Sequence, residues 1–95
     1  MREVFVKKVS TVKDKEKGLR ISSKEGNLDL LPKGNCELRV QSESGELDLE
    51  LIQADGDSCI IRGKGWRDFI RHYDLGATVT LYLDDNGSYK LQAGI

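Results

Sequence analysis

The alternation of apolar and polar residues predicts a β-hairpin in the middle of the chain. Apolar residues occupy every second position along residues 36–41 and again along residues 46–51, which is typical of strands with one buried face. A loop of four residues, 42–45, pairs Val40 with Leu47. Both apolar sets then lie on the same face, so this register is self-consistent.

The same test applies to a second hairpin formed by residues 79–83 and 89–93, which also alternate. A two-residue turn would place the two apolar sets on opposite faces of the sheet. A three-residue loop, 85–87, with its glycine left-handed, pairs Leu83 with Tyr89 and brings both sets to one face. We therefore predict the three-residue loop.

Three further strands are predicted at residues 4–9, 19–22 and 58–62, where apolar and β-branched residues are frequent. For the first of these strands, the pattern does not decide which side chains point into the core. The pattern permits two inward pairs, Val4 with Val6 or Phe5 with Val9.

Residues 66–73 are predicted to form a short helix, because four bulky residues there recur with helical spacing, namely Trp66, Phe69, Ile70 and Tyr73. This helix delivers most of the aromatic mass of the chain to the core. The preceding glycines, Gly63 and Gly65, allow a tight turn into the helix.

A second short helix is predicted over residues 23–31, with Ser23 as its cap and Pro32 directly after it. Residues 11–18 alternate in charge, and they fit either a basic polar loop or a solvated helical turn.

Together, seven short strands and two short helices predict a mostly β protein, an open seven-stranded barrel. At 95 residues, the whole chain (1–95) is expected to be a single domain.

Charge divides the chain, although its net charge is only −1. Up to Lys24 there are eight basic residues and three acidic ones, whereas residues 25–57 contain nine acidic residues and two basic ones.

The two cysteines, Cys36 and Cys59, lie in strand-like apolar runs and are expected to be reduced, as in an intracellular protein. No apolar run is long enough to cross a membrane, and the first residues do not read as a secretory signal.

Nothing in the sequence indicates an enzyme, a metal site or a cofactor. The single histidine, His72, lies opposite Trp66 on the predicted helix and is expected at the surface rather than as a general base. The two cysteines and His72 do not have the spacing of a zinc ligand set. The Asp-rich segments 55–58 and 84–87 are explained by turn chemistry and lack the ligand pattern of a calcium loop.

Residues 59–75, which read CIIRGKGWRDFIRHYDL, resemble the corresponding strand, Lys-Gly-Trp and helix of the plant-specific B-three DNA-binding domain. This domain, also called the DNA-binding pseudobarrel, occurs in auxin-response, abscisic-acid-insensitive and reproductive-meristem transcription factors. Residues 5–9 are similar to its first strand, and residues 30–32 are similar to the end of its first helix. The order of elements agrees over nearly the whole chain.

The resemblance implies a nuclear transcription regulator that binds double-stranded DNA and grips the major groove with two arms. The first arm is residues 10–20, and its basic residues are implied to contact phosphates: Lys13, Lys15, Lys17 and Arg20. The second arm is residues 53–58. The residues implied to contact DNA from this arm and the strand after it are Gln53, Ser58, Arg62 and Lys64.

The second arm departs from the family. Ala54, Asp55 and Gly56 stand where relatives that read a defined site commonly carry Trp, Asn and Ser or basic residues. Asp55 and Asp57 are expected to repel phosphates. A second hypothesis therefore stays open, in which the barrel is a protein-interaction module that has lost base reading. Its acidic strand face would then dock a basic protein partner through Glu46, Asp48 and Glu50.

Overall fold

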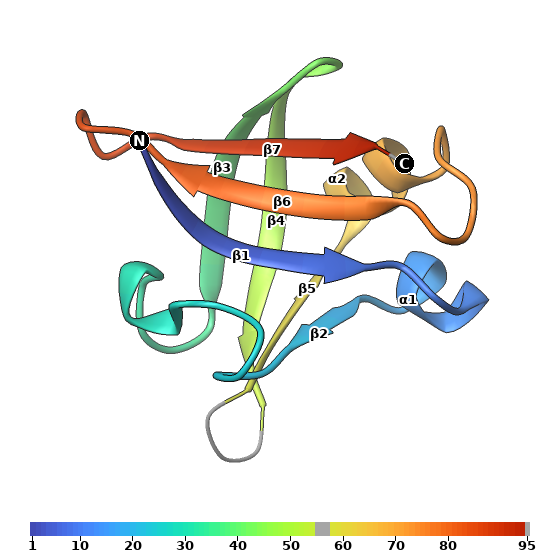
Figure 1. Ribbon diagram of the computed structural model, residues 1–95, viewed down its shortest axis with the longest axis horizontal. Helices are drawn as coiled ribbons and strands as arrows, with labels where there is room; N and C mark the ends of the chain where they lie inside the picture. Colours follow the sequence, from blue (N-terminus) through green and yellow to red (C-terminus); the bar gives the residue numbers. More distant parts are fainter. Residues whose placement is uncertain (55–57, 95) are drawn as a thin grey trace.

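The computed structural model describes residues 1–54 and 58–94, and within them it contains seven strands, two α-helices and one 3-10 helix (Figure 1). In chain order these are β1 (Arg2–Lys8), α1 (Val12–Glu16), β2 (Leu19–Ile21), η1 (Leu28–Leu30), β3 (Cys36–Ser42), β4 (Gly45–Gln53), β5 (Cys59–Arg62), α2 (Lys64–Ile70), β6 (Thr78–Leu83) and β7 (Tyr89–Gly94). No helix in this part of the chain is long and apolar enough to span a membrane.

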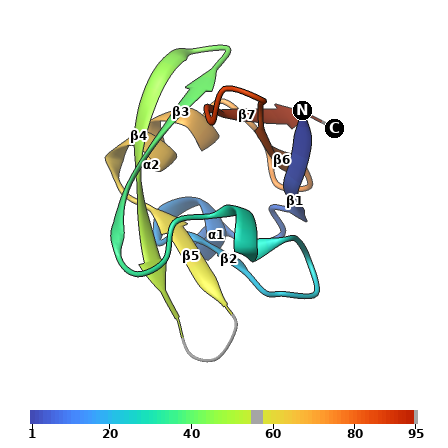
Figure 2. The same cartoon turned by 90° about the vertical axis from the view of Figure 1, so that its left-hand side faces the viewer.

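The seven strands form one sheet in the order β1-β6-β7-β3-β4-β5-β2, which curls into a nearly closed barrel. Figure 2 shows β1, β6 and β7 on one side of the molecule and β3, β4 and β5 on the other. Strands β3 and β7 pair in parallel, and every other neighbouring pair is antiparallel. This architecture confirms the open seven-stranded barrel with two helices.

Both hairpins have the predicted register. Val40 pairs with Leu47, and Leu83 pairs with Tyr89. Gly87 has a φ of 83°, the left-handed conformation that the loop was expected to require. As a result, the alternating apolar residues of the four strands lie on the inner face of the barrel, as the buried Leu38, Leu49, Leu81 and Leu91 show.

Strand β1 buries two consecutive residues, which the sequence pattern did not anticipate. Its pairing with β6 shifts register between Glu3 and Phe5, so Val4 and Phe5 are both buried. Val9 is also buried, whereas Val6 is 38% exposed. The pair Phe5 with Val9 is therefore the inward one, and the bulge adds Val4 to it.

Helix α2 covers one end of the barrel and buries Trp66, Phe69 and Ile70. Trp66 is 0% exposed, as its place on the predicted apolar face required. Gly63 enters the helix with a φ of 103°. A Cβ at Gly65 would lie 2.3 Å from the carbonyl oxygen of Asp48 on β4, so this glycine lets the helix approach the sheet closely.

The helix predicted over residues 23–31 is wrong. The chain makes a turn in which the amide of Glu25 donates to the carbonyl of Ser22, and only η1 follows. The physical reason lies at Gly26, whose backbone pairs with Phe5 of β1. The next amide, that of Asn27, donates to the carbonyl of Val4 at 2.6 Å, so strand pairing takes the place of a helical turn.

The segment between β1 and β2 contains the second α-helix instead. Of the two interpretations of residues 11–18, the helical turn is correct, because α1 occupies Val12–Glu16.

His72 is exposed at the surface, as expected. Both cysteines are free thiols, with Cys59 buried and Cys36 half-buried.

Candidate nucleic-acid interface

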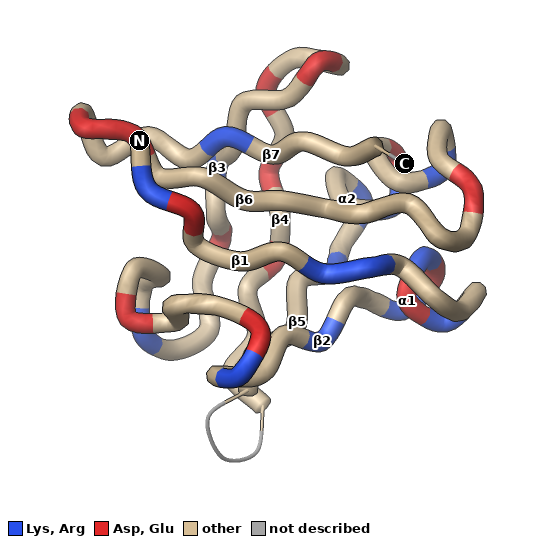
Figure 3. The backbone as a smooth tube through the Cα atoms, in the orientation of Figure 1, with Lys and Arg blue, Asp and Glu red and all other residues tan. Residues whose placement is uncertain are grey.

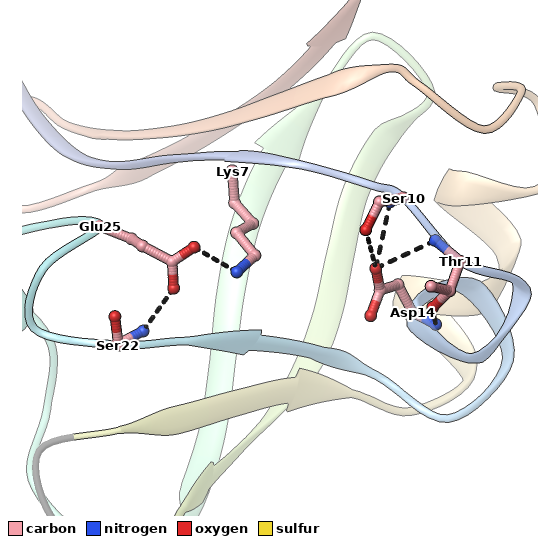
Figure 4. Close-up of polar contacts among 6 residues, drawn as sticks. All are labelled: Lys7, Ser10, Thr11, Asp14, Ser22 and Glu25. Carbon is pink, nitrogen blue, oxygen red and sulfur yellow. Dashed lines mark hydrogen bonds and ion pairs between the residues drawn. The ribbon is translucent and has the colours of Figure 1, made fainter.

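The first arm begins with a capping box that fixes the start of α1 (Figure 4). The amide of Asp14 donates to the hydroxyl oxygen of Thr11 at 3.2 Å. In return, the carboxylate of Asp14 accepts hydrogen bonds from the amides of Ser10 and Thr11 at 3.1 and 3.3 Å. Because these bonds satisfy amides that a helix start leaves free, the helix begins at a defined residue. They also occupy the only carboxylate in the first turn.

Two hydrogen bonds attach α1 to α2 and the turn that follows it. The indole Nε1 of Trp66 donates to the carbonyl of Asp14 at 2.9 Å, and Nζ of Lys15 donates to the carbonyl of Tyr73 at 2.6 Å. Since Trp66 is fully buried, the first bond joins the arm directly to the core. The arm is therefore held in place from inside the molecule.

Three of the four basic residues predicted in the first arm are exposed: Lys13, Lys17 and Arg20. Within residues 1–54 and 58–94 none of the three takes part in an ion pair. Lys13 and Lys17 are one helical turn apart and so share a side of α1. Lys15 is only half-exposed. Figure 3 shows the basic positions of α1 and β2 following one another along this part of the barrel.

Strand pairing adds a second arginine to this surface. Arg20 of β2 pairs with Ile60 of β5, so Arg20, Ile60 and Arg62 point to the same outer face. Gly18 lies against the same strand, because a Cβ there would be 2.9 Å from Cβ of Arg62. Arg62 is exposed, and its guanidinium lies 3.9 Å from a carboxylate oxygen of Glu50. The outer face of β2 and β5 thus brings two arginines together.

The four residues predicted around the second arm do not form one cluster. Gln53 ends β4 and pairs with Cys59, the first residue of β5, while Ser58 directly precedes β5; the amide of Ala54 donates to the carbonyl of Ser58 at 3.0 Å. Arg62 and Lys64 lie at the other end of β5, roughly 10 Å along the strand. Arg62 therefore belongs spatially with the first arm.

The base of the second arm is held by a side chain from another loop. Oδ1 of Asn35 accepts a hydrogen bond from the amide of Gln53 at 2.7 Å, while the side chain of Gln53 is exposed. The residues expected to oppose phosphates, Asp55 and Asp57, lie outside the described residues, as does Gly56.

A polar contact that the sequence did not reveal connects the edge strand β1 to the turn that follows β2, the other edge strand. The ammonium of Lys7 on β1 donates to the carboxylate of Glu25, which also accepts from the amide of Ser22 at 2.9 Å (Figure 4). The hydrogen bond from Lys7 lowers the pKa of the Glu25 carboxyl. Lys7 is thus paired, and the exposed charge of this region rests on other residues.

Comparison with known proteins gives a structural match without a sequence match. No family model matches the sequence, and no curated protein matches it. A solved structure described as the Arabidopsis FUS3-DNA complex is similar to the chain with a TM-score of 0.68. The match covers 99% of this chain and 98% of that chain at 16% sequence identity. It supports the B-three-like fold that the resemblance implied.

Proposed function

We propose that this chain is the DNA-binding domain of a transcription regulator that acts in the nucleus. One observation carries the proposal: three exposed cations, Lys13, Lys17 and Arg20, project from an arm that the core holds in place. The fold likeness to a protein solved with DNA supports the same conclusion. Double-stranded DNA is therefore the proposed partner.

The chemistry of the arm suits phosphate contacts. Lysines one turn apart on a fixed helix need only their side chains ordered on binding, because the backbone that carries them is already in place, and each contact with a phosphate releases counterions. Arg20 and Arg62 extend the positive surface across β2 and β5. We propose that the first arm supplies most of the affinity and that Gln53, Ser58 and Lys64 make secondary contacts as the duplex is gripped in its major groove.

Selection from a pool of random duplexes, repeated at several salt concentrations, tests this function. The parent domain is expected to bind duplexes and to lose affinity as salt rises. Lys90→Gln is the matched control, because it removes one positive charge from β7, away from the first arm. It should bind as the parent does, whereas Lys17→Gln should bind more weakly. A folded parent that binds no duplex even at low salt would overturn the proposal.

A second candidate is the protein-interaction module, and one observation favours it. Glu37 and Glu50 are directly opposite each other on the outer face of β3 and β4, where like charges are destabilising. The guanidinium of Arg62, 3.9 Å from a carboxylate oxygen of Glu50, offsets part of this repulsion, and a basic partner would relieve the rest. Titration of a labelled oligolysine peptide tests the idea: Glu37→Gln with Glu50→Gln should weaken binding, while Glu3→Gln on β1 should not.

A further inference from the structure

Lys15 differs from the other cations of the first arm in the direction of its side chain. In an α-helix successive residues are about 100° apart, so Lys15, two residues from each of them, lies about 160° around the helix axis from both Lys13 and Lys17. The ammonium of Lys15 donates to the carbonyl of Tyr73, which follows α2. Lys15 therefore faces the protein, while Lys13 and Lys17 face away from it.

The groove between the two helices agrees with this direction of the Lys15 side chain. A groove of about 410 Å³ lies between α1 and α2, and its lining includes Lys15, Val12, Ile70 and Arg71. Neither Lys13 nor Lys17 lines it. The stem of Lys15 thus lies along the junction of the helices, and its ammonium bonds to the backbone at the far side of that junction.

Helix α1 needs such support because it has only five residues. An isolated helix of this length is unstable in water, so its position depends on contacts with the rest of the protein. The bond from Trp66 holds the carbonyl of Asp14, and the bond from Lys15 holds the next residue of the same turn. Losing either bond leaves, among the described residues, one of the two hydrogen bonds that join α1 to α2 and the turn after it.

We propose that Lys15 is a positioning residue that sets the placement of α1 and thereby presents Lys13 and Lys17 to DNA phosphates, without itself contacting a phosphate. This inference rests on the proposed DNA-binding function. It divides the four basic residues of the arm into two classes: Lys13, Lys17 and Arg20 bind the duplex, and Lys15 orders the arm that carries them.

Two measurements on matched variants, Lys15→Met and Lys13→Met, test the division. The first is amide hydrogen exchange without DNA, followed by NMR at Lys17, which caps the C-terminus of α1 and whose amide donates to the carbonyl of Lys13 at 2.8 Å. Lys15→Met is expected to speed exchange at this amide by about tenfold, because a hydrogen bond from a charged donor is lost. Lys13→Met should leave exchange unchanged, and Lys15→Arg, which keeps a charged donor, should restore protection.

The second measurement is the dependence of duplex affinity on salt. Lys13→Met should reduce the slope of log K against log salt by about 0.9, as expected for one lost phosphate contact. Lys15→Met should lower affinity by about tenfold at every salt concentration and leave the slope as in the parent, because fewer molecules hold the arm in its binding conformation.

The two proposals fail in different ways. Unchanged exchange at Lys17 in Lys15→Met, or a slope reduced as much as in Lys13→Met, would overturn the positioning role. A parent domain that binds no duplex would overturn DNA binding, and the exchange measurement would still decide whether Lys15 orders α1.

Discussion

The indole N–H of Trp66 donates a hydrogen bond of 2.9 Å to the backbone carbonyl of Asp14, 52 residues earlier in the chain. The ring itself is fully buried and lies 6.3 Å from the ring of Phe69 between centroids. One side chain thus fills the core and also holds the basic arm. Stability of the barrel and placement of the candidate binding surface are therefore linked through Trp66.

Two substitutions of Trp66 should distinguish its role in filling the core from its role in bonding to the arm. Trp66→Ala is expected to lower the free energy of unfolding by about 3–5 kcal/mol, which is comparable to the whole stability expected of so small a domain. Trp66→Phe keeps an aromatic ring but removes the N–H, and it should cost about 1–3 kcal/mol because the Asp14 carbonyl loses its donor. Urea denaturation followed by circular dichroism measures both.

The control for this series is the exposed side of the same helix, which lies along the groove between α1 and α2 rather than in the barrel core. Arg67 and Arg71 are exposed, and changing either to Ala should alter the free energy of unfolding by no more than about 0.5 kcal/mol. A cooperative loss of stability in either arginine variant would show that α2 does not pack as described.

Gly65 should be intolerant of any side chain. Its missing Cβ would lie 2.3 Å from the Asp48 carbonyl oxygen, a backbone atom in a paired strand. Gly65→Ala is therefore expected to push α2 away from β4 and to destabilise the domain by about 1–3 kcal/mol. Gly94→Ala is the matched control, since a Cβ there meets nothing within 4 Å. Equal thermal midpoints for the two variants would contradict the close approach of α2 to the sheet.

The Lys7–Glu25 contact should make part of the stability depend on pH. The hydrogen bond from Lys7 lowers the pKa of Glu25 in the folded state below its ordinary value of 4.5. The stabilisation is then fully present above the unfolded pKa and is lost as the pH falls through the folded pKa. Urea denaturation between about pH 3 and pH 6 should show a shallower loss of stability in Glu25→Gln than in the parent. If the free energy of unfolding falls equally steeply with pH in the two proteins, the contact contributes nothing to acid sensitivity.

Much of the fold was predictable because the sequence constrains it locally. In each hairpin the alternation and the loop length leave one register that buries both apolar sets, and the pairs Val40–Leu47 and Leu83–Tyr89 follow it. The buried face of α2 follows equally from the spacing of its large residues. These features depend on residues that are near one another in the chain.

Features that depend on distant partners were not predictable. The segment 23–31 has a helical cap and a terminating proline, yet Gly26 pairs with β1 and prevents the helix. The bond from Lys15 to Tyr73 spans 58 residues, and no local pattern distinguishes this lysine from Lys13. The sequence indicated the basic arm itself, but the pairing of β2 with β5 was needed to place Arg62 beside Arg20.

The most direct test of DNA binding through the first arm is the salt dependence of affinity for duplex DNA, compared between the parent and the double variant Lys13→Gln/Lys17→Gln. Fluorescence anisotropy at several salt concentrations gives both affinity and slope. The account predicts weaker binding to all sequences and a slope of log K against log salt reduced by about 0.9 for each lysine removed. A folded double variant that binds with the affinity and slope of the parent would contradict it.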